Sequence, residues 1–202
     1  MATALERLEE LYAIGATRVG GSPEEDAAHD LVARWLEEAG LDVSVDARGH
    51  TFGRRGTPRV WTGSHVDSVP NGGRFDGALG VVAAIEAAER TTVPLAVVAF
   101  RDEERGCGGS LAAVAQGGLP GAYLELHIEQ GPILEALGEP LGIVTAIVGQ
   151  ARGEIVFDGR ADHAGTTPMD ARRDALVEAA AFVLRVRDAA GPGMVGDVAP
   201  SW

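Results

Sequence analysis

The sequence predicts an α/β fold in which a mixed, mostly parallel sheet is flanked by helices. Short apolar or alternating segments of strand length alternate along the chain with longer segments whose apolar residues recur at helical spacing. Hydrophobic residues make up 46% and charged residues 23% of the 202 residues, which is typical of a globular protein. The pattern changes near residue 141, so we expect a main domain over 1–141 and the start of a small α+β domain over 142–202.

The N-terminal part predicts two amphipathic helices. Residues 3–13 carry leucines at helical spacing. Ser22 is expected to be the N-cap of the second helix, with Pro23 at its first position and Glu25 closing a capping box. This helix should run to Gly40. Its predicted buried stripe is Leu31, Trp35 and Leu36.

The middle of the chain predicts the sheet. Residues 41–47 alternate between apolar and polar, and residues 59–63 form a second short strand candidate. Residues 78–90 are apolar and rich in alanine, which indicates a buried helix. The continuous apolar run at 95–100 is typical of a buried strand, and 122–128 is a further strand candidate.

The C-terminal part predicts two strands and a helix. Residues 143–148 and 154–157 are expected to pair as strands, and residues 170–187 to form an amphipathic helix. The residues expected on its buried face are Ala175, Leu176, Ala179, Ala180, Val183 and Leu184. Residues 191–202 contain Gly and Pro and show no period.

Composition excludes several kinds of partner. The net charge is −13, from 17 Lys and Arg against 30 Asp and Glu, so the chain should repel nucleic acid and acidic membrane surfaces. No secretory signal and no apolar run of membrane-spanning length is visible. The single cysteine fits a reducing compartment. We therefore expect a soluble cytoplasmic protein.

Residues that can bind metals follow three of the predicted strands. His65 and Asp67 follow 59–63, with Asp76 in the Gly-rich loop beyond them, and Glu103 and Glu104 follow 95–100. His127 and Glu129 close the strand at 122–128. Ligands in open α/β sheets bind at the carboxyl ends of the strands, and imidazole with carboxylate suits a divalent ion such as Zn²⁺ or Mn²⁺. On these grounds alone, a metal site and a set of ordinary solvated loop residues are equally good interpretations.

Four motifs resemble those of a known family. Residues 63–67 (Gly-Ser-His-Val-Asp) and 70–77 (Pro-Asn-Gly-Gly-Arg-Phe-Asp-Gly) resemble the metal motif of the dinuclear zinc amidohydrolases and peptidases related to aminoacylase. Residues 126–132 (Leu-His-Ile-Glu-Gln-Gly-Pro) and 163–169 (His-Ala-Gly-Thr-Thr-Pro-Met) resemble the hydantoinase/carbamoylase branch. That branch contains N-carbamoyl-L-amino-acid hydrolases, allantoate amidohydrolases and β-ureidopropionases. The resemblance implies a metal-dependent hydrolase that cleaves a C–N bond in a linear amide, a carbamoyl amino acid or a ureido compound.

The resemblance also implies roles for the metal-binding residues. His65 and His127 match ligands of one metal, Asp76 the carboxylate that bridges two metals, and Glu104 a ligand of the second metal. Asp67 matches the carboxylate that orients the first histidine, and Glu103 the general base that deprotonates the bridging water.

The same resemblance assigns residues 142–202 to a partial lid and dimerisation domain. His163 matches a histidine that steadies the oxyanion in the partner's site of a family dimer. Gln150 and Arg152 fall where the family places substrate contacts, although Arg152 is equally well a surface charge. His163 has an alternative role as a turn residue of the lid.

Two departures from the family weaken the implied activity. Family members are roughly twice this length, and the last metal-ligand histidine lies in the part that this chain lacks. Only 22 residues separate Glu104 from His127, where the family has a longer connection. Asp76 and Glu104 would therefore leave the second of up to two metals one ligand short. The alternatives are a hydrolase that works as a homodimer or with a complementing chain, one subunit of a split enzyme, and a non-catalytic metal-binding or dimerising fragment.

Overall fold

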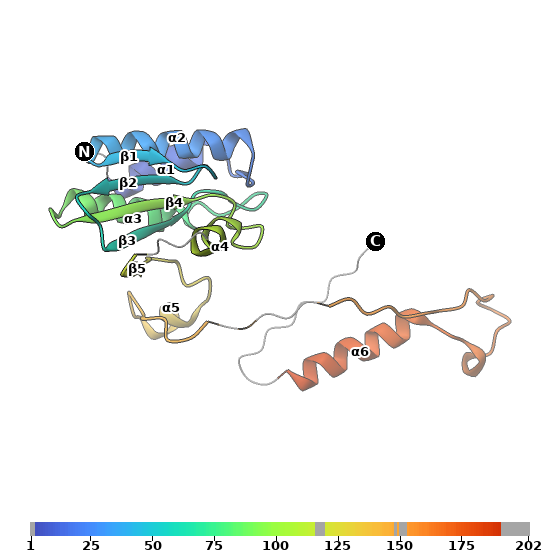
Figure 1. Ribbon diagram of the computed structural model, residues 1–202. Coiled ribbons are helices and arrows are strands. Elements are labelled where there is room, and N and C mark those ends of the chain that lie inside the picture. Colours follow the sequence, from blue (N-terminus) through green and yellow to red (C-terminus); the bar gives the residue numbers. More distant parts are fainter. Residues whose placement is uncertain (1–2, 116–119, 148, 150–152, 191–202) are drawn as a thin grey trace. The chain divides into compact units, whose positions relative to one another are not determined.

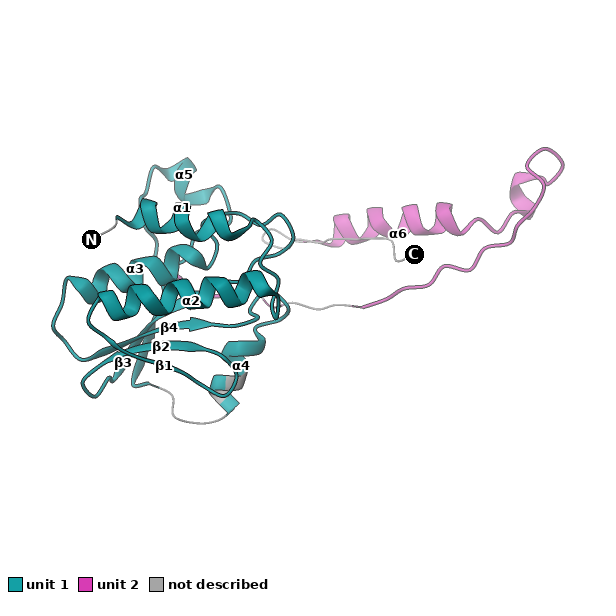
Figure 2. Cartoon of the chain, turned by 90° about the horizontal axis from the view of Figure 1, so that it is seen from above, with its two compact units in different colours: residues 1–142 teal, residues 143–202 magenta. Residues whose placement is uncertain are grey.

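The computed structural model describes residues 3–115, 120–147, 149 and 153–190. Over this part the chain divides into two compact units, residues 1–142 and 143–202, which are coloured separately in Figure 2. Within the described residues, no helix is both long enough and apolar enough to cross a membrane.

The first unit is built on one five-stranded sheet, whose order is β1-β2-β4-β3-β5 (Figure 1). Its strands are β1 (Asp42–Val45), β2 (Thr51–Arg55), β3 (Val60–His65), β4 (Leu95–Phe100) and β5 (Ala122–Leu124). The pairs β3–β4 and β3–β5 are parallel, whereas β1–β2 and β2–β4 are antiparallel. The expected α/β fold with a mixed sheet is thus confirmed, with parallel and antiparallel pairings in equal number.

Three helices cover one face of this sheet, as Figure 2 shows. They are α1 (Ala4–Ile14), α2 (Pro23–Glu38) and α3 (Ala78–Glu89). The main apolar core joins their buried faces to alternate residues of β4, because successive side chains of a strand point to opposite faces. The predicted stripe of α2 lies in this core. A smaller cluster of Phe52, Val98 and Phe100 forms on the other face, where Ala113 of α4 (Gly108–Ala115) packs.

The start of α2 differs from the prediction in one contact. Ser22 is the N-cap and accepts the backbone N–H of Glu25, as expected. The Glu25 carboxylate does not return to Ser22 and so closes no capping box; it accepts the backbone N–H of Gly21 at 2.6 Å. The side chain is instead buried against the loop after β4, where stronger donors are available.

The observed strands differ from the prediction in two ways: β5 is shorter than predicted, and β2 was not predicted. β5 ends at Leu124, four residues before the predicted end, and within the described part of the chain it pairs with β3 alone. β2 was not predicted, since Gly53 and two arginines break its apolar pattern. Gly53 lies so close to α2 that an added Cβ would stand 2.9 Å from the Leu36 side chain, so the glycine permits this packing.

The second unit is described by itself. It contains the short 3₁₀ helix Met169–Ala171 and α6 (Ala175–Ala189), whose N-cap is Asp174. The helix therefore begins later than predicted, at Ala175. The carboxylate of the preceding Asp174 accepts the backbone N–H groups of Leu176 and Val177. The predicted buried face of α6 is wrong for this chain, because none of its residues is buried and Leu176 is 78% exposed.

The predicted strands at 143–148 and 154–157 are also not observed. Residues 143–147 and 153–160 carry no strand assignment, and residue 148 lies outside the described part. Their apolar side chains, including Ile143, Val144 and Ile155, are exposed. Two strands without a covering layer are marginal in water, which accounts for the difference. Also unpredicted is the short helix α5 (Ile133–Leu137), which lies in the first unit.

Candidate metal centre

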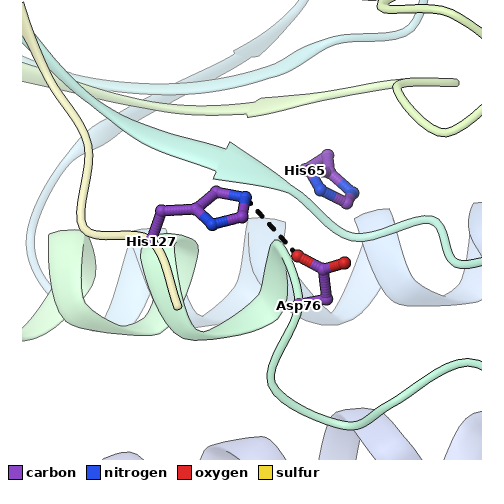
Figure 3. A group of neighbouring side chains, drawn as sticks. All are labelled: His65, Asp76 and His127. Carbon is purple, nitrogen blue, oxygen red and sulfur yellow. Dashed lines mark ion pairs between the residues drawn. The ribbon is translucent and has the colours of Figure 1, made fainter. Parts of the chain in front are cut away.

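Three side chains that can each offer a ligand to a metal ion lie together at the carboxyl ends of β3 and β5 and the loop before α3 (Figure 3). His65 is the last residue of β3, Asp76 precedes the N-cap of α3, and His127 follows β5 by three residues. Each offers one ligand atom, and these atoms lie within 4.8 Å of one another. The parallel pairing of β3 with β5 brings residues 62 positions apart in the sequence to one edge of the sheet.

Gly77 allows the loop to approach the His65 ring. Its φ is +62°, a left-handed conformation that glycine adopts without steric cost. A Cβ at this position would lie 2.5 Å from Cε1 of His65. Glycine is therefore required both for the turn into α3 and for the space that the imidazole fills.

The two carboxylate oxygens of Asp76 have different surroundings. Oδ1 lies 3.5 Å from Nε2 of His127, as the dashed line in Figure 3 marks. This atom is buried and has no hydrogen-bond partner among the described residues. Oδ2 accepts a hydrogen bond of 2.6 Å from Nε2 of Gln130. A buried carboxylate oxygen without a donor is costly unless a cation neutralises it.

His65 is oriented by Asp67. Its Nδ1 lies 3.2 Å from Oδ1 of Asp67, and its Nε2 lies 3.7 Å from Oε2 of Glu103. Burial lowers the pKa of His65, but the hydrogen bond to Asp67 and the surrounding carboxylates outweigh burial and raise it to about 9 in the metal-free protein. Nδ1 also lies 3.2 Å from the backbone carbonyl oxygen of Asp67. With Nδ1 facing these two oxygens of Asp67, Nε2 is left available to a metal.

Glu103 and Glu104 lie on the loop that follows β4. Two buried carboxylates accept hydrogen bonds from the backbone of this loop and fix its position. The backbone N–H of Glu104 donates to Asp67 at 3.1 Å, and that of Asp102 donates to Glu25 at 2.9 Å. Glu103 and Glu104 are each partly exposed and do not form a fully buried pair of charges. Burial raises the pKa of Glu104, and the negative charges of Asp76, Glu103 and Asp67 add to this effect, whereas His65 opposes it.

These residues fit a divalent ion. Two imidazoles and a carboxylate are common ligands of Zn²⁺ and are also accepted by Mn²⁺. The unpartnered Oδ1 of Asp76 and the crowded carboxylates both favour a bound cation. Glu104 is not one of the three residues whose ligand atoms converge within 4.8 Å.

The remaining predicted site residues belong to the second unit, which is described by itself. His163 is exposed, and its Nδ1 accepts the backbone N–H of Gly165 at 3.1 Å. Gln150 and Arg152 lie outside the described residues. The substrate contacts expected for these three residues therefore stay predictions.

Sequence reasoning missed three residues around the centre. Gln130 contacts Asp76, Cys107 donates its thiol to Oε1 of Glu103 at 3.2 Å, and Glu25 anchors the loop after β4. Gln130 lies inside the motif at 126–132, so its position in the sequence could have identified it as a residue of the site. Cys107 gave no such signal, and the position of Glu25 fitted a capping box equally well.

The fold and the site together define a mixed α/β domain with a candidate divalent-metal centre at the carboxyl edge of its sheet. The chain belongs to peptidase family M20/M25/M40, whose family model matches residues 61–197. The expected relationship to the hydantoinase/carbamoylase branch is confirmed by relatives and by solved structures.

Two curated relatives illustrate the branch. The chain is 40% identical over 229 aligned residues to the N-carbamoyl-L-amino acid amidohydrolase of Geobacillus stearothermophilus, an alignment that covers 87% of this chain and 56% of the relative. It is 35% identical to a probable allantoate deiminase of Oryza sativa subsp. japonica, covering 81% of this chain and 45% of that protein. The chain thus spans about half the length of the curated relatives that it matches.

A solved structure agrees with this assignment. The hydantoinase/carbamoylase family amidase of Burkholderia multivorans superposes with a TM-score of 0.69 at 32% identity. The match covers 92% of this chain and 59% of that amidase.

Proposed function

We propose that this chain carries the metal-binding part of a hydrolase that cleaves a C–N bond in an N-carbamoyl amino acid or in a ureido compound such as allantoate. The observation that carries the proposal is the convergence of His65, Asp76 and His127 in a chain similar to enzymes with those two activities. We further propose that the protein is cytoplasmic and that its metal is Zn²⁺ or Mn²⁺.

The proposed roles are those that the family resemblance implies, and the contacts of His65, Asp76 and His127 support them. His65, Asp76 and His127 would hold one ion, and Asp76 with Glu104 would contribute to a second. When bound, a divalent ion at this position would supply Lewis-acid chemistry and would lower the pKa of water. Asp67 keeps the His65 ring in the orientation that presents Nε2.

Glu103 is the proposed general base. Its Oε2 lies 3.7 Å from Nε2 of His65 and so faces the metal centre, and its side chain is 32% exposed, which leaves it accessible to water. Glu103 would accept a proton from the attacking water, whose oxygen bonds to the carbonyl carbon, and would pass that proton to the leaving nitrogen as the C–N bond breaks. His163, Gln150 and Arg152 are proposed to contact the substrate in the assembled enzyme.

Metal analysis tests the first step of this proposal. Three ligands should bind one divalent ion tightly, and two ligands should bind a second ion weakly. We expect His65→Ala or His127→Ala to abolish the tight site, whereas His163→Ala leaves it intact. Two equally tight ions per chain would contradict this ligand set.

A second candidate function is a non-catalytic metal-binding or dimerising fragment, or one subunit of a split enzyme. It is favoured by the proposed second site, to which only two residues, Asp76 and Glu104, are assigned. Turnover of N-carbamoyl amino acids and allantoate by the metal-loaded chain separates the alternatives, since a fragment binds the ion without turnover.

A further inference from the structure

Gln130 combines an unfavourable backbone conformation with a contact to the metal centre. Its φ is +55°, in the left-handed region that residues other than glycine, asparagine and aspartate seldom adopt. Its side-chain amide donates to Oδ2 of Asp76 at 2.6 Å, across 54 positions of sequence. The residue lies between β5 and α5 and is not one of the three converging ligands.

Overall stability gives little reason for glutamine at this position. A residue held in the left-handed region costs on the order of 1–3 kcal/mol, which glycine would avoid. The side chain of Gln130 is exposed, and a single solvent-accessible hydrogen bond offsets only part of such a cost. Strained residues of this kind are concentrated at functional sites, where the surrounding structure maintains them.

The contact has a direct effect on Asp76. The terminal torsion of an aspartate is broad, so an unrestrained carboxylate samples many orientations. With Oδ2 held by Gln130, Oδ1 is directed to the buried position 3.5 Å from Nε2 of His127, where it has no other partner among the described residues. Each carboxylate oxygen has two lone pairs, so the hydrogen bond leaves Oδ2 able to bind a second ion.

We propose that Gln130 is a positioning residue that orients Asp76 for metal binding, and that its strained backbone is retained for this purpose. The inference rests on the proposed metal-dependent function. It adds a residue whose role is to set the direction of the carboxylate that both ions would share.

Variants at Gln130 separate metal positioning from folding. Gln130→Gly removes the amide and the backbone strain together, and Gln130→Asn keeps a residue that tolerates the left-handed region but shortens the side chain by one methylene. Asn71→Gly is the matched control, because exposed Asn71 has a similar φ of +54° and is not one of the three converging ligands. The full chain is stripped of metal, and its Zn²⁺ affinity is measured by competition with a chromophoric chelator.

We expect Gln130→Gly and Gln130→Asn to weaken Zn²⁺ binding by about 10–100-fold, the usual effect of losing a partner of a metal ligand. The melting temperature of metal-free Gln130→Gly should equal or exceed that of the wild type. The visible absorption spectrum of the Co²⁺-loaded protein should change in both Gln130 variants and stay as in the wild type in Asn71→Gly.

The alternative outcomes are distinct. Wild-type affinity and an unchanged Co²⁺ spectrum in Gln130→Gly would overturn this inference and leave the proposed metal centre standing. Equal loss of affinity in Asn71→Gly would also overturn it, since the effect would then come from the backbone. A wild-type chain that binds neither metal would overturn both the inference and the proposed function.

Discussion

Cys107 reports on the charge of Glu103. The thiol donates to the Glu103 carboxylate, and this hydrogen bond, with burial and the negative charge, raises the pKa of Cys107. Replacing Glu103 by Gln removes the negative charge, so the thiolate fraction at pH 8 should rise. We expect Glu103→Gln to increase the rate of alkylation by iodoacetamide, which is measured directly because Cys107 is the single cysteine.

Glu104→Gln is the matched control for that measurement. Glu104 is adjacent in sequence but does not contribute to the raised pKa of Cys107. Its replacement should leave the alkylation rate close to the wild-type value. Equal rates in wild type and Glu103→Gln would contradict the hydrogen bond that places Glu103 beside the thiol.

His65 predicts how the metal-free protein responds to pH. Its folded pKa of about 9 exceeds the ordinary value of 6.5, so between these values the folded chain binds a proton that the unfolded chain has lost. This contribution to the free energy of unfolding is complete below pH 6.5 and disappears as pH rises through 9. In His65→Gln, urea unfolding between pH 6.5 and 9 should show a smaller decline in stability than in the wild type.

His29 predicts the opposite slope at acidic pH. Burial, with a smaller effect of nearby positive charge, lowers the pKa of His29 to about 3, and its Nδ1 lies 2.9 Å from Oγ1 of Thr51. As pH falls from 6.5 towards 3, the unfolded chain gains a proton that the folded chain does not accept, so stability declines. His29→Asn should flatten this part of the stability profile, and an unchanged acid slope would exclude His29 as its source.

At the residue scale, chemistry was easier to predict than geometry. The positions of His65 and His127 after predicted strands placed them at one edge of the sheet with several carboxylates, because parallel strands end at the same edge. The resemblance to the family singled out these two residues and Asp76 as ligands of one ion. The contact between Gln130 and Asp76 depends on side-chain torsions and on a left-handed backbone, neither of which follows from residue spacing.

At the scale of elements, Glu25 joins the start of α2 to the end of β4. Its fully buried carboxylate accepts from Arg101 at 2.9 Å and from the backbone N–H of Asp102 at 2.9 Å. In Glu25→Ala the backbone N–H of Asp102 would lose its acceptor, whereas Arg101 would keep its ion pair with Asp26 at 2.7 Å. We expect the variant to lower the free energy of unfolding by about 1–3 kcal/mol, the penalty for leaving a buried donor without a partner.

Glu24→Ala tests whether the effect belongs to the buried contact. Glu24 lies on the same helical turn but is exposed, so its loss should change stability by less than about 0.5 kcal/mol. Chemical denaturation of both variants measures the difference. Similar values for the two would show that the acidic first turn of α2, and not the link to β4, is what stabilises the fold.

The sequence pattern correctly predicted the elements that bury a face against another layer of the structure. The predicted strand 95–100 agrees with β4 because all six of its residues are buried, and α2 agrees because its apolar stripe faces the core. The failures at 143–148 and 154–157 have the same cause, since alternation predicts a strand only where another layer buries one face. β2 escaped prediction because a glycine at its centre serves packing against α2.

At the scale of the whole molecule, the second unit predicts association. The apolar residues Leu176, Val177 and Leu184 of α6 are at least half exposed, as is much of the apolar sequence from 143 to 156. Exposed apolar surface of this extent is typical of a protein interface. We expect sedimentation at micromolar concentration to show a dimer or larger species, and Leu176→Lys with Leu184→Lys to shift it towards monomer. Leu5→Lys, at an exposed position of α1, is the control that should leave the mass unchanged.

This chain is expected to be a slow catalyst in the absence of a partner. In the proposed assignment only Asp76 and Glu104 would hold a second ion, so that ion would be bound weakly and would contribute little to the activation of water. His163 belongs to the second unit, whereas His65, Asp76 and His127 belong to the first, and the oxyanion role proposed for His163 would require the assembled enzyme. We therefore expect the metal-loaded chain to turn over N-carbamoyl-L-amino acids slowly.

Adding a polypeptide that corresponds to the unmatched part of the Geobacillus stearothermophilus relative should raise both turnover and the number of tightly bound ions per chain. Glu103→Gln in that mixture should keep the metal content and lower turnover by roughly 10²–10⁴-fold, because it removes the base and no ligand. Rapid turnover by the chain alone, with two tightly bound ions, would mean that a residue other than Asp76 and Glu104 completes the second site.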